Sequence, residues 1–494
     1  MKKRGQDPNA QTYTVLFRGF ANSEHPKLAV SEAVRMYHSM LSSTRLKPNI
    51  IHMNAVLEVC GLAGDIDSMF SIVSTVDERA RVPDNRTYTI ILNSLRPKIP
   101  THRLPRRNPR EEDDEAEADP EREAAGAADM AVINQAKAIW AEVISKWRKA
   151  KIIIDERLVC AMGRILRHGG HEENDEILDL LEQTMNIPRQ DRPQPAQQGE
   201  QPTSAVVKVK SQSHIGYAVP DRNTLSLVLE ALRANRKTSL GPKYWDLFVN
   251  VYGVEPDKEN YHSFLRLLRV GHNSTRTADV IQKMPPSMLV AKTFRIGLSC
   301  CVKDNLNRHA FANATRVFKA MKALRFPDAL AMRLYIQATR ANFRPVTANM
   351  SELDGKFALG RQIAIALDNM WEPFGTLTRS FSFSSRPTRS PAEAWERTAN
   401  EQMEAMAVAR RMVAAMDFVV TEVAAEPNVI KQLRTRRNIL NRYVLMFQER
   451  RHKMEKNLKT LEEVEEDESA SRAPWAPRAP EGQVTTSETP HRRY

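Results

Sequence analysis

Apolar residues recur at helical spacing within short segments of the chain, and the same polar pair separates one segment from the next. One face of a helix expected over residues 31–40 carries Ala33, Val34, Tyr37 and Met40. The separating pair is Pro followed by Asn or Asp. Proline cannot continue a helix, because it lacks a backbone N–H, and an Asn or Asp side chain accepts hydrogen bonds from the free N–H groups of a new helix. The pattern therefore predicts successive helical hairpins.

The Pro-Asn or Pro-Asp pair recurs along the chain, and Pro48-Asn49 and Pro83-Asp84 lie 35 residues apart. A fixed period with the same separating residues is the signature of a repeat array. Each unit would be one hairpin that buries its apolar face against its neighbours. The six junctions are Pro8-Asn9, Pro48-Asn49, Pro83-Asp84, Pro220-Asp221, Pro256-Asp257 and Pro327-Asp328.

The residues that follow these junctions resemble the pentatricopeptide repeat, or PPR, whose units run about 35 residues. The resemblance implies an all-α fold: an α-solenoid in which PPR hairpins form a right-handed superhelix, with a helical C-terminal extension. The alternative is a TPR-like array that binds protein, although the TPR pattern of small residues at a spacing of about 34 is not evident. The matching segments are Thr12-Tyr13-Thr14, Thr87-Tyr88-Thr89, Thr224-Leu225-Ser226, Asn260-Tyr261-His262 and Thr293-Phe294-Arg295, and Ile154-Asp155 replaces Pro-Asp before Leu158-Val159-Cys160.

Composition separates repeats from stretches that cannot bury a core. Residues 97–129 are Pro-rich, then Arg-rich, then acidic, and residues 188–219 are rich in Gln and Pro. We expect both to be disordered insertions in inter-helix loops, where a solenoid tolerates them. The expected division is 1–96 (a partial repeat, two repeats and the first helix of a third), 97–129, 130–340 (further repeats, interrupted at 188–219), 341–461 (a C-terminal helical region with a loop at 374–391) and 462–494 (a disordered tail).

The charge balance points to a polyanionic partner. The net charge is +13 and the isoelectric point is near 9.5. Residues 111–123 carry nine acids against Arg122, so the rest of the chain is more basic than the total indicates. A basic surface of this kind suits nucleic acid. Ordinary solvated helix faces remain the alternative explanation of the charge.

Nothing in the sequence indicates catalysis, and we expect neither a cofactor nor a metal site. The four cysteines form no Cys-x-x-Cys pair. The dense acids lie in the runs 111–123 and 462–468, which we expect to be unstructured and so unable to hold a metal with fixed geometry. No Gly-rich phosphate loop occurs, and no apolar run approaches the ~18 residues of a membrane span. The cysteines are Cys60, Cys160, Cys300 and Cys301.

The resemblance also implies which residues would read RNA. In PPR proteins one repeat reads roughly one base through two residues: the one after the Tyr position and the terminal Asn or Asp of the turn. By family resemblance the first three repeats would prefer A, U and G and the fifth a second G, while Cys160 leaves the fourth undecided. The pairs are Thr14 with Asn49, Asn54 with Asp84, Thr89 with Asp155, Cys160 with Asp221, and Ser226 with Asp257.

Later repeats depart from this pattern, because His262, Arg295 and Arg333 occupy the base-reading position. The two arginines would stack on bases or bind phosphate. They would equally be solvated, or pair with an acid such as Asp328. We therefore expect the C-terminal half to bind RNA without selecting its bases.

A basic helix is expected near the C-terminus. Residues 427–459 carry ten Lys or Arg against Glu449 and Glu455. Apolar residues at spacings of three, four and seven mark the packed face and leave a basic ladder on the other. RNA-backbone contact, docking to a ribonucleoprotein and a plain capping helix all fit this ladder. It includes Arg434, Arg437, Arg442, Arg450 and Arg451.

The resemblance implies a single-stranded RNA-binding protein of the fungal mitochondrial type, with mitochondrial mRNA or rRNA as its partner. It would act in the matrix, in RNA processing, stability or translation, without enzymatic activity and without DNA as a partner. Two alternatives stay open. The first is an RNA-binding structural subunit or assembly factor of the mitochondrial ribosome, in contact with ribosomal proteins; the second is a protein-binding adaptor. Residues 1–9 resemble the end of a repeat, so we expect further repeats and a targeting peptide upstream of Met1.

Overall fold

The computed structural model divides the chain into two compact units, residues 1–349 (unit 1) and 350–494 (unit 2). It describes residues 8–77, 80–96, 120–192, 216–321, 327–341, 343, 347, 350–382, 391–422 and 424–471. Within these ranges, the side chains of 120–129, 380–382, 391–401, 450 and 453–471 are left out.

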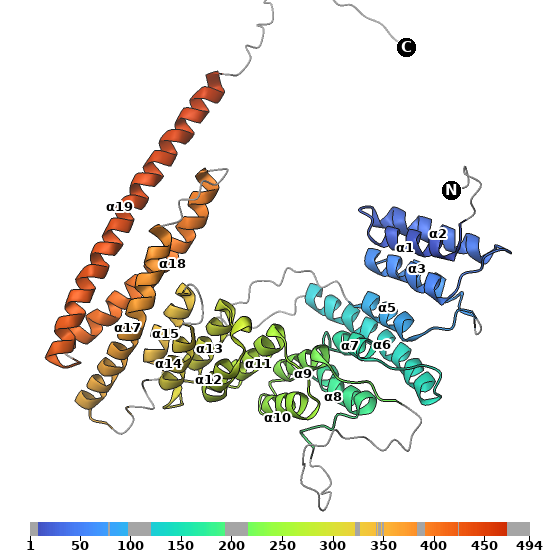
Figure 1. Cartoon of the computed structure of the whole chain (residues 1–494), viewed down its shortest axis with the longest axis horizontal. Coiled ribbons are helices and arrows are strands. Elements are labelled where there is room, and N and C mark those ends of the chain that lie inside the picture. The colour runs from blue at the N-terminus through green and yellow to red at the C-terminus, as the bar shows by residue number, and fades with distance from the viewer. Residues whose placement is uncertain are drawn as a thin grey trace, which may run out of the picture. The chain divides into compact units, whose positions relative to one another are not determined.

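Unit 1 is a series of helical hairpins (Figure 1). The first helices are α1 (Ala10–Ala21), α3 (Ile50–Ala63), α5 (Asn85–Leu95), α7 (Glu156–Leu166), α9 (Arg222–Ala234), α11 (Lys258–Val270), α13 (Ala291–Lys303) and α15 (Ala329–Ala341). The second helices are α2 (Pro26–Leu41), α4 (Ile66–Val73), α6 (Pro120–Arg148), α8 (His171–Met185), α10 (Leu240–Asp246) with the π-helix η2 (Leu247–Val251), α12 (Ser274–Lys283) and α14 (Ala310–Ala320). A 3₁₀ turn, η3 (Pro286–Met288), precedes α13.

The predicted Asn and Asp caps are confirmed at five of the six Pro-Asn/Asp junctions. Each of these side chains accepts a hydrogen bond from the backbone N–H of the third helical residue, which satisfies a donor that the helix itself leaves free. The acceptor-to-donor distances are 2.9 Å for Asn9, 3.1 Å for Asn49, 2.8 Å for Asp84, 2.8 Å for Asp257 and 2.9 Å for Asp328. Asp155, after Ile154, caps α7 in the same way at 2.9 Å. Asp221 does not, because the N–H that it would cap donates to Glu156 instead.

The first helices pack on one another in chain order, from α1 through to α15. Each first helix buries large apolar side chains. A single repeat is too small to bury them alone, so neighbouring repeats must cover them. The predicted all-α solenoid of helical hairpins is confirmed. Fully buried examples along the row are Phe17, Met53, Leu57, Leu92, Phe264, Phe294 and Tyr335.

Unit 2 consists of α17 (Glu352–Ser382), α18 (Pro391–Thr421) and α19 (Pro427–Ser471), and α18 packs against both other helices. Two arginines of α19 fasten it to the other helices. Arg436 donates to Asp368 of α17 at 3.0 Å and lies over the Trp371 ring, and Arg437 pairs with Asp417 of α18. The buried core includes Ile363, Leu367, Met370, Val408, Met412, Met416, Leu433 and Leu440.

Some boundaries differ from those expected. The loop expected at 374–391 is helical up to Ser382, because Phe374 and Leu377 continue the buried face of α17 beyond Pro373. Helix α6 begins at Pro120 rather than 130, and α19 continues to Ser471. The edges of the insertion 188–219 are packed, with Arg189 and Ala218 buried. Residues 97–119, 193–215 and 472–494 lie outside the described residues.

Candidate functional site

The residues expected to face RNA share one position, the fifth residue of each first helix. Because every first helix begins directly after its capping residue, the fifth residues fall at the same helical phase and recur once per hairpin. The cap of the next helix is the second member of each expected pair. The fifth residues are Thr14, Asn54, Thr89, Cys160, Ser226, His262, Arg295 and Arg333.

In the second repeat the expected pair is joined directly. The Asn54 amide Nδ2 donates to Asp84 Oδ1 at 3.2 Å, and Asn54 Oδ1 lies 2.7 Å from the hydroxyl of Thr87. Thr87 Oγ1 also lies 2.8 Å from Asp84 Oδ1, so its single proton serves one of two acceptors. Asn54 is 4% exposed and Thr87 is fully buried. The triangle fixes the amide orientation of Asn54.

In the first and third repeats an intermediate residue links the pair. The Thr14 hydroxyl donates to the Ala10 carbonyl at 3.1 Å, and His52 Nε2 lies 3.0 Å from the same oxygen. Asn49 in turn caps the backbone N–H of His52.

In the third repeat Thr89 donates to the Asn85 carbonyl at 2.7 Å, and the Asn85 side chain donates to Asp155 at 2.9 Å. In both repeats the hydroxyl of the fifth residue is held by its own helix, and a neighbouring residue makes the contact across helices.

The fifth repeat uses an asparagine as its link. Asn260 Nδ2 donates to Ser226 Oγ at 2.8 Å and to the Arg222 carbonyl at 2.9 Å. Asp257 caps Asn260 and donates its own N–H to Asn260 Oδ1 at 2.9 Å. Ser226 and Asp257 are thereby connected through one buried amide.

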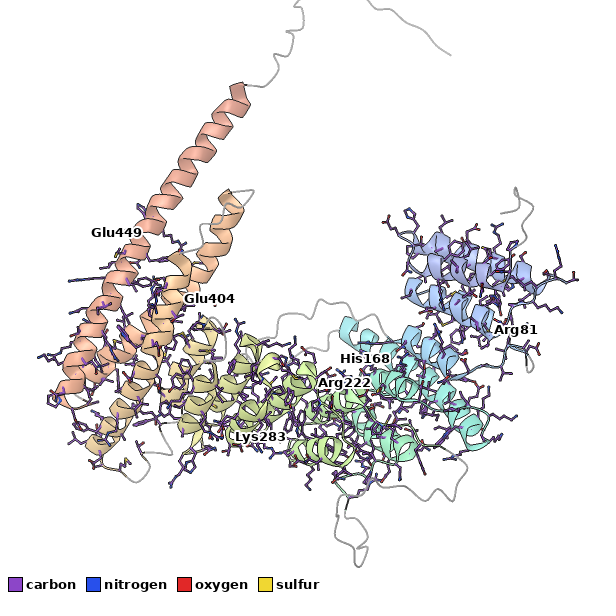
Figure 2. The ribbon with its side chains drawn as sticks, in the orientation of Figure 1. Arg81, His168, Arg222, Lys283, Glu404 and Glu449 are labelled. Carbon is purple, nitrogen blue, oxygen red and sulfur yellow. The ribbon has the colours of Figure 1, made fainter. Side chains whose placement is uncertain are left out.

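At the fourth repeat a different acid caps the next helix. Glu156, the first residue of α7, accepts from the Thr224 N–H at 3.1 Å and from the Thr224 hydroxyl at 3.0 Å. It thus takes the role at the start of α9 that Asp221 was expected to fill. Asp221 is left exposed, with the guanidinium of its neighbour Arg222 3.7 Å away; Figure 2 labels Arg222.

Cys160, the fifth residue of α7, is 1% exposed and lies 3.7 Å from Thr224 Oγ1. Burial, with the nearby Glu156 carboxylate, raises the pKa of its thiol to about 12. At this repeat the expected pair is therefore not brought together, and the fifth residue is a buried neutral thiol.

His262 of the sixth repeat is fully buried and bonded internally. Its Nε2 lies 3.0 Å from Thr293 Oγ1, and its Nδ1 lies 3.4 Å from Glu259 Oε1. Burial lowers the pKa of His262, with Glu259 acting in the opposite direction. A neutral imidazole buried in this way does not present a positive charge to phosphate.

Arg295 of the seventh repeat makes a two-bond ion pair with the next cap, Asp328. The distances are 2.8 Å from Nε and 2.6 Å from Nη2. Arg333 of α15 is half-buried, and its Nε has no hydrogen-bond partner within the described chain. Asp328, which the sequence suggested as an alternative partner for the later arginines, is therefore the acid that binds Arg295.

Sequence reasoning missed a row of buried polar residues at the third position of the first helices. Each bonds backward to the preceding first helix, and together they form a polar seam down the row. The available signal was the capping-box spacing, in which a polar residue follows the cap by three. These third-position residues are His52, Thr87, Thr224, Asn260 and Thr293, all at most 1% exposed.

The described residues hold no group of three or more His, Cys, Asp or Glu side chains that could bind a metal ion. Among the same residues, no helix is both long and apolar enough to cross a membrane.

No family model matches the sequence. Among curated proteins, the mitochondrial pentatricopeptide repeat-containing protein 2 of Schizosaccharomyces pombe is 22% identical over 315 residues, which is 61% of this chain and 63% of that protein. A chloroplastic pentatricopeptide repeat-containing protein of Arabidopsis thaliana is 32% identical over 95 residues, which is 19% of this chain and 12% of that protein. The matches span less than two thirds of the length of either relative.

Among solved structures, the chain is similar to the pentatricopeptide repeat protein PPR10 in complex with an 18-nt psaJ RNA element. The identity is 14%, the TM-score is 0.38, and the match covers 85% of this chain and 52% of that one. PPR10 from maize matches at 11% identity and a TM-score of 0.28, over 90% of this chain and 71% of that one. In its capped helical hairpins and in its curated relatives, the chain is similar to pentatricopeptide repeat proteins.

Proposed function

We propose that this chain binds single-stranded RNA along the row of first helices and acts in mitochondrial RNA processing, stability or translation. The observation that carries the proposal is the recurrence of one fifth-position residue per hairpin, at the same helical phase in first helices that pack on one another in chain order. A strand whose bases are spaced along this row would meet one such position per repeat. The net charge of +13 supports a polyanionic ligand.

Base reading is proposed for the first, second, third and fifth repeats, where the fifth residue is a hydroxyl or an amide. Asn54 supports this best, since its bonds to Asp84 and Thr87 fix the orientation of its amide. The residues are Thr14 with Asn49, Asn54 with Asp84, Thr89 with Asp155, and Ser226 with Asp257, in the expected order A, U, G, undecided, G.

Arg295 and Arg333 are proposed to contact phosphate rather than bases. Arg295 keeps 43% of its side chain exposed while it is paired with Asp328. The ion pair between Arg295 and Asp328 also joins α13 to the start of α15.

A second function, an RNA-binding structural subunit or assembly factor of the mitochondrial ribosome, is favoured by the sixth and seventh repeats. There, His262 and Arg295 are bonded to neighbouring repeats rather than presented to a ligand. An array that reads few bases would suit a protein held in place by many partners.

Crosslinking the chain to RNA in cells, followed by sequencing of the bound fragments and sedimentation of the complex, separates the two functions. A site with the order A-U-G-x-G supports the first, and comigration with a ribosomal subunit with crosslinks confined to rRNA supports the second. Absence of RNA crosslinks would reject both and leave the protein-binding adaptor.

Base reading is tested with Asn54→Ser combined with Asp84→Asn. Fluorescence anisotropy with RNA oligonucleotides that vary one base at a time should show a changed preference at one position, by about fivefold or more. The matched control is Asn250→Ser with Asp67→Asn, both exposed and both on second helices. If preference is unchanged at every position, the second repeat does not read a base.

A further inference from the structure

Helix α19 carries two different faces, and one of them has no partner among the described residues of unit 2. Ile430, Leu433 and Leu440 are buried against the rest of unit 2, as a packed helix requires. The opposite side carries Ile439, Leu445 and Met446, which are 52%, 58% and 53% exposed. This outward face is therefore apolar in part without contributing to the core of unit 2.

The exposed residues are spaced as a helix–helix seam. Thr435, Ile439, Arg442, Met446 and Glu449 follow one another at alternating steps of four and three residues. Ile439 and Met446 therefore lie on one side of α19 at equivalent positions one heptad apart, and the polar residues Thr435, Arg442 and Glu449 occupy the alternate positions along the same line. Glu449 is labelled on α19 in Figure 2. We call these five residues the α19 seam.

The α19 seam is flanked by basic side chains that form no ion pair with the described residues of unit 2. Arg436 and Arg437 are tied to Asp368 and Asp417. In contrast Lys431, Arg434 and Arg442 are exposed and make no ion pair with the described residues. No acid occurs between residues 427 and 448. A partner would therefore need apolar side chains for Ile439 and Met446 together with carboxylates for Arg442 and its neighbours.

A second copy of α19 does not meet that requirement. In an antiparallel pair of α19 helices, Ile439 would face Met446 of the other copy, which places the two Arg442 side chains together near the axis. Like charges opposed in this way are destabilising. RNA does not fit the seam either, because phosphates would pair with the arginines but leave the apolar side chains exposed to water.

We propose that the α19 seam docks an acidic amphipathic helix of a partner protein, which adds a fourth helix to unit 2. The apolar face of that helix would cover Ile439 and Met446, and its flanking Glu or Asp side chains would pair with Lys431, Arg434 and Arg442. This surface belongs to unit 2 and the row of first helices to unit 1, so the proposal does not depend on RNA binding.

The test uses the full chain and a synthetic helical peptide with leucine at the a and d positions and glutamate beside them. We expect the peptide to bind, and Ile439→Gln with Met446→Gln to weaken binding by about tenfold or more. Both residues are already exposed, so the change leaves folding intact. Arg442→Glu should also weaken binding, and a peptide with lysine in place of the single glutamate opposite residue 442 should restore it.

The matched control is Leu306→Gln with Arg308→Glu, on an exposed turn of unit 1 where Leu306 is 86% exposed. This control should leave peptide binding unchanged, and all variants should keep the RNA affinity of the parent chain. The proposal is overturned if the parent chain does not bind the acidic peptide or if the Leu306 control weakens binding equally. It is also overturned if the seam variants reduce RNA binding or self-association instead of peptide binding.

Discussion

Replacing Thr87 by valine tests whether the polar seam between first helices holds the candidate RNA site together. Valine keeps the shape of threonine but removes the hydroxyl, which lies 2.7 Å from Asn54 Oδ1 and 2.8 Å from Asp84 Oδ1. The hydroxyl also accepts from the Asp84 N–H at 3.2 Å. Two kinds of interaction are lost: part of the capping box of α5 and the bond between α5 and α3.

A control variant separates these two contributions. Thr12 of α1 makes the same capping-box contacts, with its hydroxyl 2.9 Å from Asn9 Oδ1 and 3.4 Å from the Asn9 N–H, and α1 is the first helix of the described row. Thr12→Val therefore removes the cap contacts without a bond to a preceding helix. The difference between Thr87→Val and Thr12→Val measures the bond to Asn54.

The expected difference follows from the burial of Asn54. Its side chain is 4% exposed, so loss of the Thr87 donor leaves a buried carbonyl oxygen without that partner. Such a loss costs about 1–3 kcal/mol. We expect Thr87→Val to lower the free energy of unfolding in urea by about 2 kcal/mol more than Thr12→Val. Amide exchange should accelerate in α3 and α5, and base preference at the second repeat should weaken because Asn54 loses its fixed orientation.

The reasoning is refuted if the two variants have the same stability within about 0.5 kcal/mol, the usual scatter for surface changes. Loss of stability with unchanged base preference would leave the seam as a packing element and remove its proposed role in RNA reading.

Three further predictions concern other parts of unit 1. Glu156→Ala should destabilise the chain by about 1 kcal/mol and Asp221→Ala by less than about 0.5 kcal/mol in urea unfolding, because Glu156 rather than Asp221 caps α9; the reverse order would contradict the observed cap. Arg189 is 3% exposed and pairs with Asp175, Asp179 and Asp191, so Arg189→Met should cost about 3 kcal/mol. The Arg189 guanidinium holds the pKa of Asp191 well below its ordinary value. The stabilisation from this ion pair is therefore complete above the unfolded pKa of about 3.9 and is lost as the pH falls through the folded pKa. Between about pH 5 and pH 2 the stability of Arg189→Met should fall less than that of the parent chain, and parallel curves of stability against pH would count against the ion pairs. Burial raises the pKa of all four thiols, to about 12 for Cys60 and Cys160 and to about 11 for Cys300, so iodoacetamide at about pH 8 should label the cysteines in urea but not in the native chain.

The local parts of the site were predictable from sequence, because they depend on residues close together in the chain. A cap and the third residue of its helix are three positions apart, so Pro83-Asp84 before Thr87 indicates both the start of α5 and the hydrogen bond that caps it. The fifth position follows from that start by counting. The family pattern also grouped Asn54 with Asp84 as a base-reading pair, and the structure joins the two side chains by a hydrogen bond.

Contacts between repeats were harder to predict, because they depend on how neighbouring helices are set against each other. Glu156 and Thr224 are 68 residues apart, and a whole hairpin and an insertion separate them. Either Glu156 or Asp221 could have capped α9 on sequence grounds, and only the placement of α7 beside α9 selects Glu156. The ion pair of Arg295 with Asp328 and the pairing of Arg437 with Asp417 were decided in the same way.

By itself, the sequence determined that the chain is a series of capped helical hairpins and which residue of each hairpin occupies the fifth position. Caps and helical phase are set within a few residues, where backbone geometry leaves little choice. The tertiary structure decided which of these residues remain available to a ligand. Packing one first helix against the next commits His262 and Arg295 to neighbouring repeats, buries Cys160 and leaves Asp221 exposed. It also separates the basic ladder of α19 into arginines that fasten unit 2 and arginines that face outward.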